Sequence, residues 1–185
     1  MKTKGVGFWV ANSEMAVSAE ADDRGLAAVR IDITGELSRI PSLKNSKLPG
    51  RNFINPDTMQ RLKALDVLYF QTVAARPGSL SFGTEEVLGL LICGKRPVRF
   101  DLDNCAAAVK DWLEPATKRG RGWGVGLVED DARLNILPVR GELTGLDVRR
   151  SVLILRRWVD VKRSFATFAS EAFGARSGIG SKRCE

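Results

Sequence analysis

Acidic residues gather at two places in the second half of the chain. Asp101 and Asp103 follow the apolar run VLGLLICGKRPVRF, which we expect to form a buried strand. Side chains of an extended chain repeat every two residues, so both carboxylates should share one face. A second cluster, residues 129–131, precedes the extended run ARLNILPVRGEL, which could lie beside the first strand. Three carboxylates at one point are the usual requirement for holding Mg²⁺ against a phosphodiester.

A helix is expected directly after this first acidic pair. The segment CAAAVKDWLE favours helix, Asp103 or Asn104 can cap its first turn, and Pro115 ends it. The acids would then lie at a strand-to-helix junction, beside amide groups that also attract phosphate oxygens. An ordinary acidic cap followed by an acidic turn is the alternative interpretation of the same residues.

The absence of histidine narrows the possible chemistry. The sequence has no histidine and three cysteines without metal-like spacing. The absence of histidine excludes histidine-based metal sites, serine or cysteine triads with His, and an imidazole base. The cysteine spacing argues against a zinc site and a disulfide framework. Any hydrolysis must therefore rely on carboxylates, lysines, metal-bound water or the substrate.

In their order along the chain, these motifs resemble the RusA-type Holliday-junction resolvases, small endodeoxyribonucleases common in phages and prophages. The family's Asp-x-Asp-Asn motif, its helical Asp and its later Asp pair are matched by Asp101, Asp103, Asn104, Asp111, Asp130 and Asp131. Upstream, its Pro-Ser-x-x-Asn loop is matched by Pro41, Ser42 and Asn45. The similarity spans roughly Val29 to Arg157.

The resemblance implies a Mg²⁺-dependent nuclease that resolves four-way DNA junctions by paired nicks. It makes Asp101, Asp103 and Asp131 the catalytic metal ligands, and the choice between Asp130 and Asp131 stays open. It also implies a homodimer, because a two-fold axis presents two sites to the symmetric strands of a junction.

The family's catalytic lysine has no direct counterpart, because Ala107 stands at its position. Lys110 lies seven residues after Asp103, about two helical turns and roughly 10 Å along the same face, and is the predicted catalytic substitute. Other basic residues are further candidates, namely Lys44, Lys47, Lys95 and Arg99. Two functions other than a nuclease are considered. One is an accessory protein that binds branched DNA without cutting it, and the other is a phage structural or regulatory protein.

Charge favours a polyanionic partner. The chain has 29 Lys and Arg against 22 Asp and Glu, a formal charge of +7 and a pI near 9.7. Residues 149–185 alone carry +6, including the pairs Arg149-Arg150 and Arg156-Arg157 around the apolar run SVLIL. These pairs either contact phosphates or solvate the ends of a strand. The predicted DNA-binding residues lie in two basic loops: Lys44, Lys47, Arg51, Lys118, Arg119 and Arg121.

Length and composition predict one compact α/β domain. The resemblance to RusA implies a mixed sheet with helices packed on it. We expect an N-terminal extension over 1–28, the nuclease-like domain over 29–158, and a basic C-terminal helix and tail over 159–185.

The segment GVGFWVA, near the N-terminus, is expected to be a strand or loop. Trp123 lies in the segment RGRGWGVGLV, here called the glycine loop, and either packs beneath this loop or stacks on a base. No apolar run of about 18 residues and no leader pattern are visible, so we expect a cytoplasmic protein without membrane contacts.

A long helix is expected from about Pro56 to Ala75, opened by Asn-Pro-Asp as a cap. Its broad apolar face is most simply explained as core. The residues predicted to be buried there are Met59, Leu62, Leu65, Val67, Leu68 and Phe70.

Overall fold

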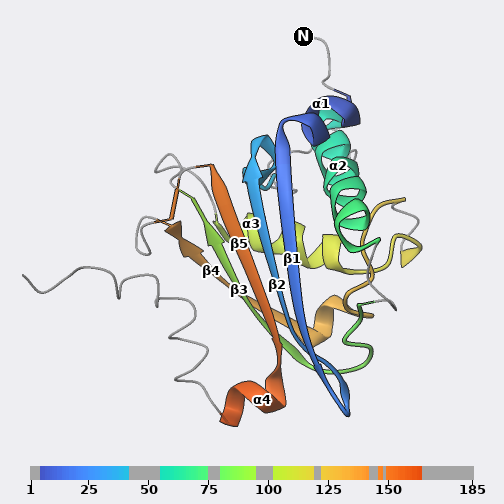
Figure 1. Cartoon of the computed structure of the whole chain (residues 1–185), viewed down its shortest axis with the longest axis vertical. Coiled ribbons are helices and arrows are strands. Elements are labelled where there is room, and N and C mark those ends of the chain that lie inside the picture. Colours follow the sequence, from blue (N-terminus) through green and yellow to red (C-terminus); the bar gives the residue numbers. More distant parts are fainter. Residues whose placement is uncertain are drawn as a thin grey trace, which may run out of the picture.

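A five-stranded mixed sheet carries the fold (Figure 1). The computed structural model describes residues 5–41, 55–74, 80–94, 102–118, 122–141, 146–147 and 149–163. In spatial order the strands are β1 (Ser13–Asp22), β2 (Gly25–Gly35), β5 (Arg150–Arg157), β3 (Val87–Cys93) and β4 (Leu134–Arg140). The neighbours β1, β2, β5 and β3 pair antiparallel, whereas β3 and β4 are parallel.

The helices gather mainly on one face of this sheet. Those described are α1 (Val6–Ala11), α2 (Pro56–Val73), α3 (Leu102–Leu113) and α4 (Trp158–Arg163), with short 3-10 turns η1 (Glu36–Ser38) and η4 (Asp131–Arg133). The main core joins apolar residues of α2 and α3 to one face of β2, β3 and β5. A smaller cluster on the other face joins β3 and β5 to α4. The predicted α/β domain is confirmed at this level. None of the described helices has the length and hydropathy to cross a membrane.

Helix α2 begins where the sequence predicts. The side chain of Asn55 accepts a hydrogen bond from Asp57 N (2.9 Å), and Pro56 occupies the first turn, where its missing N–H costs nothing. The predicted burial is wrong at two positions, because Val67 is 38% exposed and Phe70 is 51% exposed. Only one side of α2 faces the sheet, so the run LDVLYF cannot be buried all round.

The unit β3-α3-β4 determines where the acidic residues lie. β3 and β4 are parallel, with Val87 opposite Leu134, and α3 connects them in the sequence. A connecting helix must run back along the sheet, so the start of α3 lies toward the end of β3 and its last turn lies toward the start of β4. The C-terminal turn of α3 therefore meets η4, which immediately precedes β4.

The N-terminal segment corrects one prediction. GVGFWVA, expected to be a strand or loop, contains helix α1. Trp9 is buried, with Val6 and Val10 packed against the same core, and this i, i+3, i+4 spacing is that of a helix face. The guanidinium of Arg61 on α2 lies 4.7 Å from the Trp9 ring centroid, which fixes α1 on α2. Residues 6–28, predicted as an extension, form α1, β1 and the start of β2.

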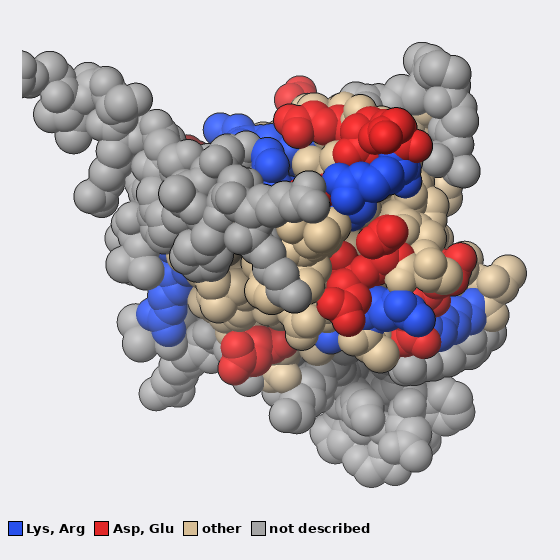
Figure 2. Space-filling view, turned by 90° about the horizontal axis from the view of Figure 1, so that it is seen from below, with Lys and Arg blue, Asp and Glu red and all other residues tan. Residues whose placement is uncertain are grey.

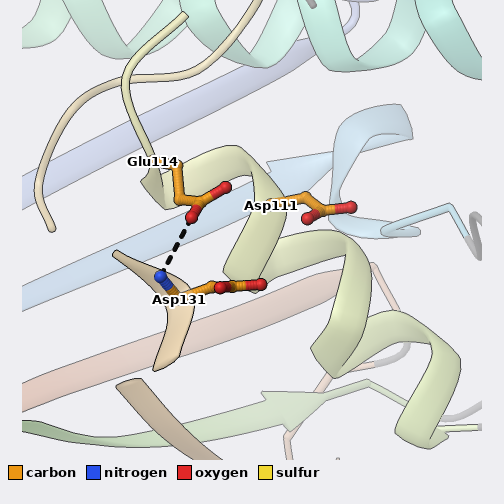
Figure 3. A group of neighbouring side chains, drawn as sticks. All are labelled: Asp111, Glu114 and Asp131. Atoms are coloured by element: carbon orange, nitrogen blue, oxygen red, sulfur yellow. Dashed lines mark hydrogen bonds between the residues drawn. The ribbon is translucent and has the colours of Figure 1, made fainter. Parts of the chain in front are cut away.

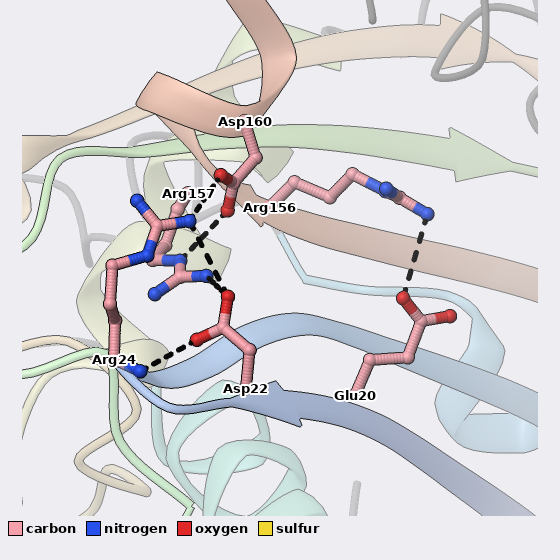
Figure 4. A network of polar contacts seen from close by, with 6 residues as sticks. All are labelled: Glu20, Asp22, Arg24, Arg156, Arg157 and Asp160. Atoms are coloured by element: carbon pink, nitrogen blue, oxygen red, sulfur yellow. Dashed lines mark hydrogen bonds and ion pairs between the residues drawn. The ribbon is translucent and has the colours of Figure 1, made fainter. Parts of the chain in front are cut away.

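An arginine-aspartate network joins the β1-β2 turn to α4 (Figure 4). Arg157, at the end of β5, is 1% exposed and donates to both Asp22 and Asp160. Arg24 donates to the same two carboxylates, at 3.4 Å and 2.9 Å. Buried charge requires such pairing. Arg157 therefore has a structural role, rather than the phosphate contact considered for the Arg156-Arg157 pair.

This network predicts loss of stability in acid. The hydrogen bond from Arg157 lowers the pKa of Asp22 from 3.8 to about 2. A lowered folded-state pKa contributes stability above pH 4 that disappears as the pH falls from about 4 to 2. Denaturant unfolding of Asp22→Asn and wild type should therefore differ at pH 5 and converge near pH 2. A difference independent of pH would show that the carboxylate charge of Asp22 does not stabilise the fold.

Candidate metal centre

Three carboxylates meet where α3 ends and η4 begins (Figure 3). Asp111 lies in the last turn of α3, Glu114 directly follows the last residue of that helix, and Asp131 is the first residue of η4. One carboxylate oxygen from each lies within 4.8 Å of the others. Asp111 and Asp131 are half-buried, whereas Glu114 is fully buried.

The spacing of the oxygens suits a divalent cation. Mg²⁺ and Ca²⁺ take oxygen ligands at about 2.0–2.6 Å, so oxygens that share one ion lie roughly 3–5 Å apart. The three carboxylates lie within that range, because one oxygen of each is within 4.8 Å of the others. The group could therefore bind a metal ion, and the all-oxygen ligands favour a hard cation.

Two hydrogen bonds, from Asp131 and Lys118, hold the Glu114 side chain in place. Its Oε1 accepts a hydrogen bond from the backbone N–H of Asp131 (2.9 Å), which fixes η4 against α3. The same oxygen accepts from Nζ of Lys118, four residues later in the chain, at 2.5 Å. A buried carboxylate needs such donors to stay ionised. Glu114 thus joins the helix, the turn and a lysine at one atom.

Lys118 also contacts the turn after the glycine loop. Its Nζ lies 3.1 Å from the carbonyl oxygen of Glu129 and 3.3 Å from Asp130 Oδ1. The contact with Glu114, followed by that with Asp130, raises the pKa of Lys118, so the lysine remains cationic. Asp130 caps η4 by accepting from Ala132 N (3.0 Å), and this bond, followed by that from Lys118, lowers the pKa of Asp130.

The glycine loop closes tightly over the end of α3. Val125 N, Gly126 N and Val128 N donate to carbonyl oxygens of the last turn of α3 and of Glu114. Gly124 has a φ of +135°, and a Cβ there would overlap the carbonyl oxygen of Glu114. Only glycine fits at this position. Trp123 is 1% exposed, so it packs beneath the loop, and the base-stacking alternative is wrong.

Asp66 on α2 links this loop to α3 by two hydrogen bonds. Its Oδ1 accepts from Trp112 Nε1 (2.8 Å) and its Oδ2 from Gly124 N (2.9 Å). Burial raises the pKa of Asp66 from 3.8 to about 6, against the opposing effect of these two hydrogen bonds. Asp66 thus supports the last turn of α3, which carries Asp111 and directly precedes Glu114.

The raised pKa of Asp66 predicts a stability change in the opposite direction to that of Asp22. A folded-state pKa above the unfolded value contributes stability that is complete below about pH 4 and is lost as the pH rises to about 6. Relative to Asp66→Asn, the wild type should therefore lose free energy of unfolding between pH 4 and pH 6 and then remain level. Denaturant titrations at half-unit pH steps test this, and a flat difference across that window would contradict it.

Of the two predicted ligands that the structure describes, Asp131 lies in the carboxylate group and Asp103 does not. Asp131 belongs to the carboxylate group, and its partners there are Asp111 and Glu114. Asp103 is exposed in the first turn of α3, eight residues or about 12 Å of helix from Asp111. Asp101 lies outside the described residues, so its role as a ligand stays a prediction.

Of the basic residues predicted to act in catalysis or DNA binding, the structure describes two. Lys118 lies at the carboxylates, and Lys110 is half-buried on α3 immediately before Asp111. Ala107 is exposed on α3. The remaining predicted DNA contacts lie outside the described residues: Lys44, Lys47, Arg51, Arg119 and Arg121.

Glu114 is the functional candidate that sequence reasoning missed. Asp111 and Glu114 are three residues apart, so they share one face of a helix. That spacing was a usable signal. It was overlooked because Glu114 directly precedes Pro115 and resembles an ordinary polar helix end.

No protein-family model matches this chain, and neither curated proteins nor solved structures give a significant match.

Proposed function

We propose that this protein is a Mg²⁺-dependent endodeoxyribonuclease that nicks branched DNA, related in fold and chemistry to the RusA-type resolvases. The observation that carries the proposal is the group of Asp111, Glu114 and Asp131 at the junction of α3 and η4. Asp131 is common to this group and to the ligand set that the resemblance implies. Only the resemblance supports Asp101 and Asp103 as ligands, and our proposal places the cation at Asp111, Glu114 and Asp131.

The ligand chemistry supports a phosphodiester substrate. A divalent cation held by three carboxylates would supply Lewis acidity and a bound water of lowered pKa. Glu114 positions Asp131 through the backbone N–H of that residue, and Lys118 places a positive charge within the same cluster. Without histidine in the chain, these groups are the ones suited to phosphodiester hydrolysis.

The distribution of charge supports a polyanionic partner. The described residues include 18 Asp and Glu and 15 Lys and Arg, a net charge of −3, and Figure 2 shows both signs interleaved on one face. The other residues carry +10, which outweighs that deficit and gives the total of +7. We therefore assign phosphate contacts mainly to these basic segments, which include Lys44, Lys47 and Arg51. Paired nicks would require two copies of the chain, and we propose a homodimer.

A second function is favoured by one observation. Ala107, at the family position of the catalytic lysine, is exposed on α3 and offers no charge. A protein that binds branched DNA as a recombination accessory, without cutting it, fits that substitution.

The test is incubation of purified protein with a labelled four-way junction and a matched linear duplex, in Mg²⁺ or EDTA. The nuclease predicts symmetric, Mg²⁺-dependent nicks in the junction, resolved on a denaturing gel. Junction binding without nicks would favour the accessory protein. Failure both to bind and to cut would refute both functions.

A further inference from the structure

The carboxylate group already contains a cation that belongs to the chain. Lys118 Nζ lies 2.5 Å from Glu114 Oε1 and 3.3 Å from Asp130 Oδ1. An ammonium group at such distances offsets part of the negative charge of the cluster, which a divalent metal ion would also do. The lysine therefore bears directly on how the site accepts a divalent cation.

The contacts of Glu114 Oε1 show which partner can leave. One donor to this oxygen is the backbone N–H of Asp131, which is fixed by η4. The other is the end of a flexible side chain that is 27% exposed, so its ammonium has a route to solvent. A divalent ion bound to the cluster would also repel the ammonium over a few ångströms.

We propose that Lys118 is an exchangeable counter-ion of the carboxylate group: a divalent cation displaces its ammonium from Glu114, and the freed ammonium then binds a phosphate of the DNA. This inference rests on the proposed function. It gives Lys118 two states, bound to Glu114 without the metal and turned to the substrate with it. Cation binding and DNA binding should therefore strengthen one another, since each favours the released lysine.

The first experiment measures Mn²⁺ affinity without DNA, by calorimetry at pH 8, for wild type and Lys118→Met. Removing the competing charge should tighten Mn²⁺ binding about tenfold. Lys118→Arg, which keeps the charge, should stay close to wild type. Arg140→Met removes the same charge at the exposed far end of β4 and should leave affinity unchanged.

Equal or weaker Mn²⁺ binding by folded Lys118→Met, checked by its circular dichroism spectrum, would overturn the exchange while leaving the metal centre in place. If wild type itself binds no Mn²⁺, the proposed function and the inference fail together. These two failures are distinguishable because the first leaves wild-type binding intact.

The second experiment measures the salt dependence of junction binding in Ca²⁺ and in EDTA. Lys118→Met should lower the slope of log K against log salt by about one in Ca²⁺. In EDTA the slope should not change, because Lys118 is then engaged by Glu114. Equal changes under both conditions would contradict the exchange.

Discussion

Asp131→Asn should lower the rate of Mg²⁺-dependent junction nicking at least about 100-fold, because an amide replaces the carboxylate that η4 contributes to the cation. The backbone N–H of Asp131, which donates to Glu114, is unchanged, so the local fold should persist. Single-turnover cleavage at saturating protein measures the effect on rate, and gel-shift assays measure binding separately.

Asp130→Asn is the matched control for this substitution. The neighbouring carboxylate caps η4 by accepting from Ala132 N, and an asparagine oxygen can accept the same bond. Its effect on nicking should stay within about threefold, since Asp130 is outside the three-carboxylate group. If Asp130→Asn were the more damaging change, the ligand would be the preceding residue of the pair.

Gly124→Ala should destabilise the fold by about 3 kcal/mol or more, combining backbone strain with steric overlap. The φ of +135° is unfavourable for alanine, and the added Cβ would meet the carbonyl oxygen of Glu114. Relief of that overlap must move either the loop or the last turn of α3. We therefore expect loss of Mn²⁺ affinity together with the loss of stability, both measured on the same preparation.

Gly122→Ala separates strain from overlap. Gly122 also has a positive φ, +67°, but a Cβ there meets nothing within 4 Å. Its cost should be about 1 kcal/mol, and Mn²⁺ affinity should be retained. Equal destabilisation by the two substitutions in denaturant unfolding would contradict a specific role for the contact between Gly124 and Glu114.

Much of the fold was predictable because local patterns and tertiary packing agree. β3 and β4 are apolar runs that do pair side by side, and α2 has both a capping Asn55 and a Pro56 start. The prediction from sequence was wrong where the same pattern of apolar residues is compatible with two structures. In α1, apolar residues fit a strand or loop as readily as a short helix, and only packing on α2 settles the choice.

The candidate site was predictable only in part. Asp131 was named from its motif, but its partners depend on the direction of α3, which brings the end of that helix to the start of β4. Local spacing does not reveal such a meeting. The resemblance to RusA placed Asp103 and Asp131 together, whereas the structure groups Asp131 with Asp111 and Glu114.

The proposed function requires that Asp111, Glu114 and Asp131 together hold the working cation. The most direct measurement is an anomalous difference map from crystals of the protein grown with Mn²⁺. We expect a peak within about 2.6 Å of carboxylate oxygens from all three residues. A peak held by Asp101 and Asp103, with none at Asp111 and Glu114, would contradict it.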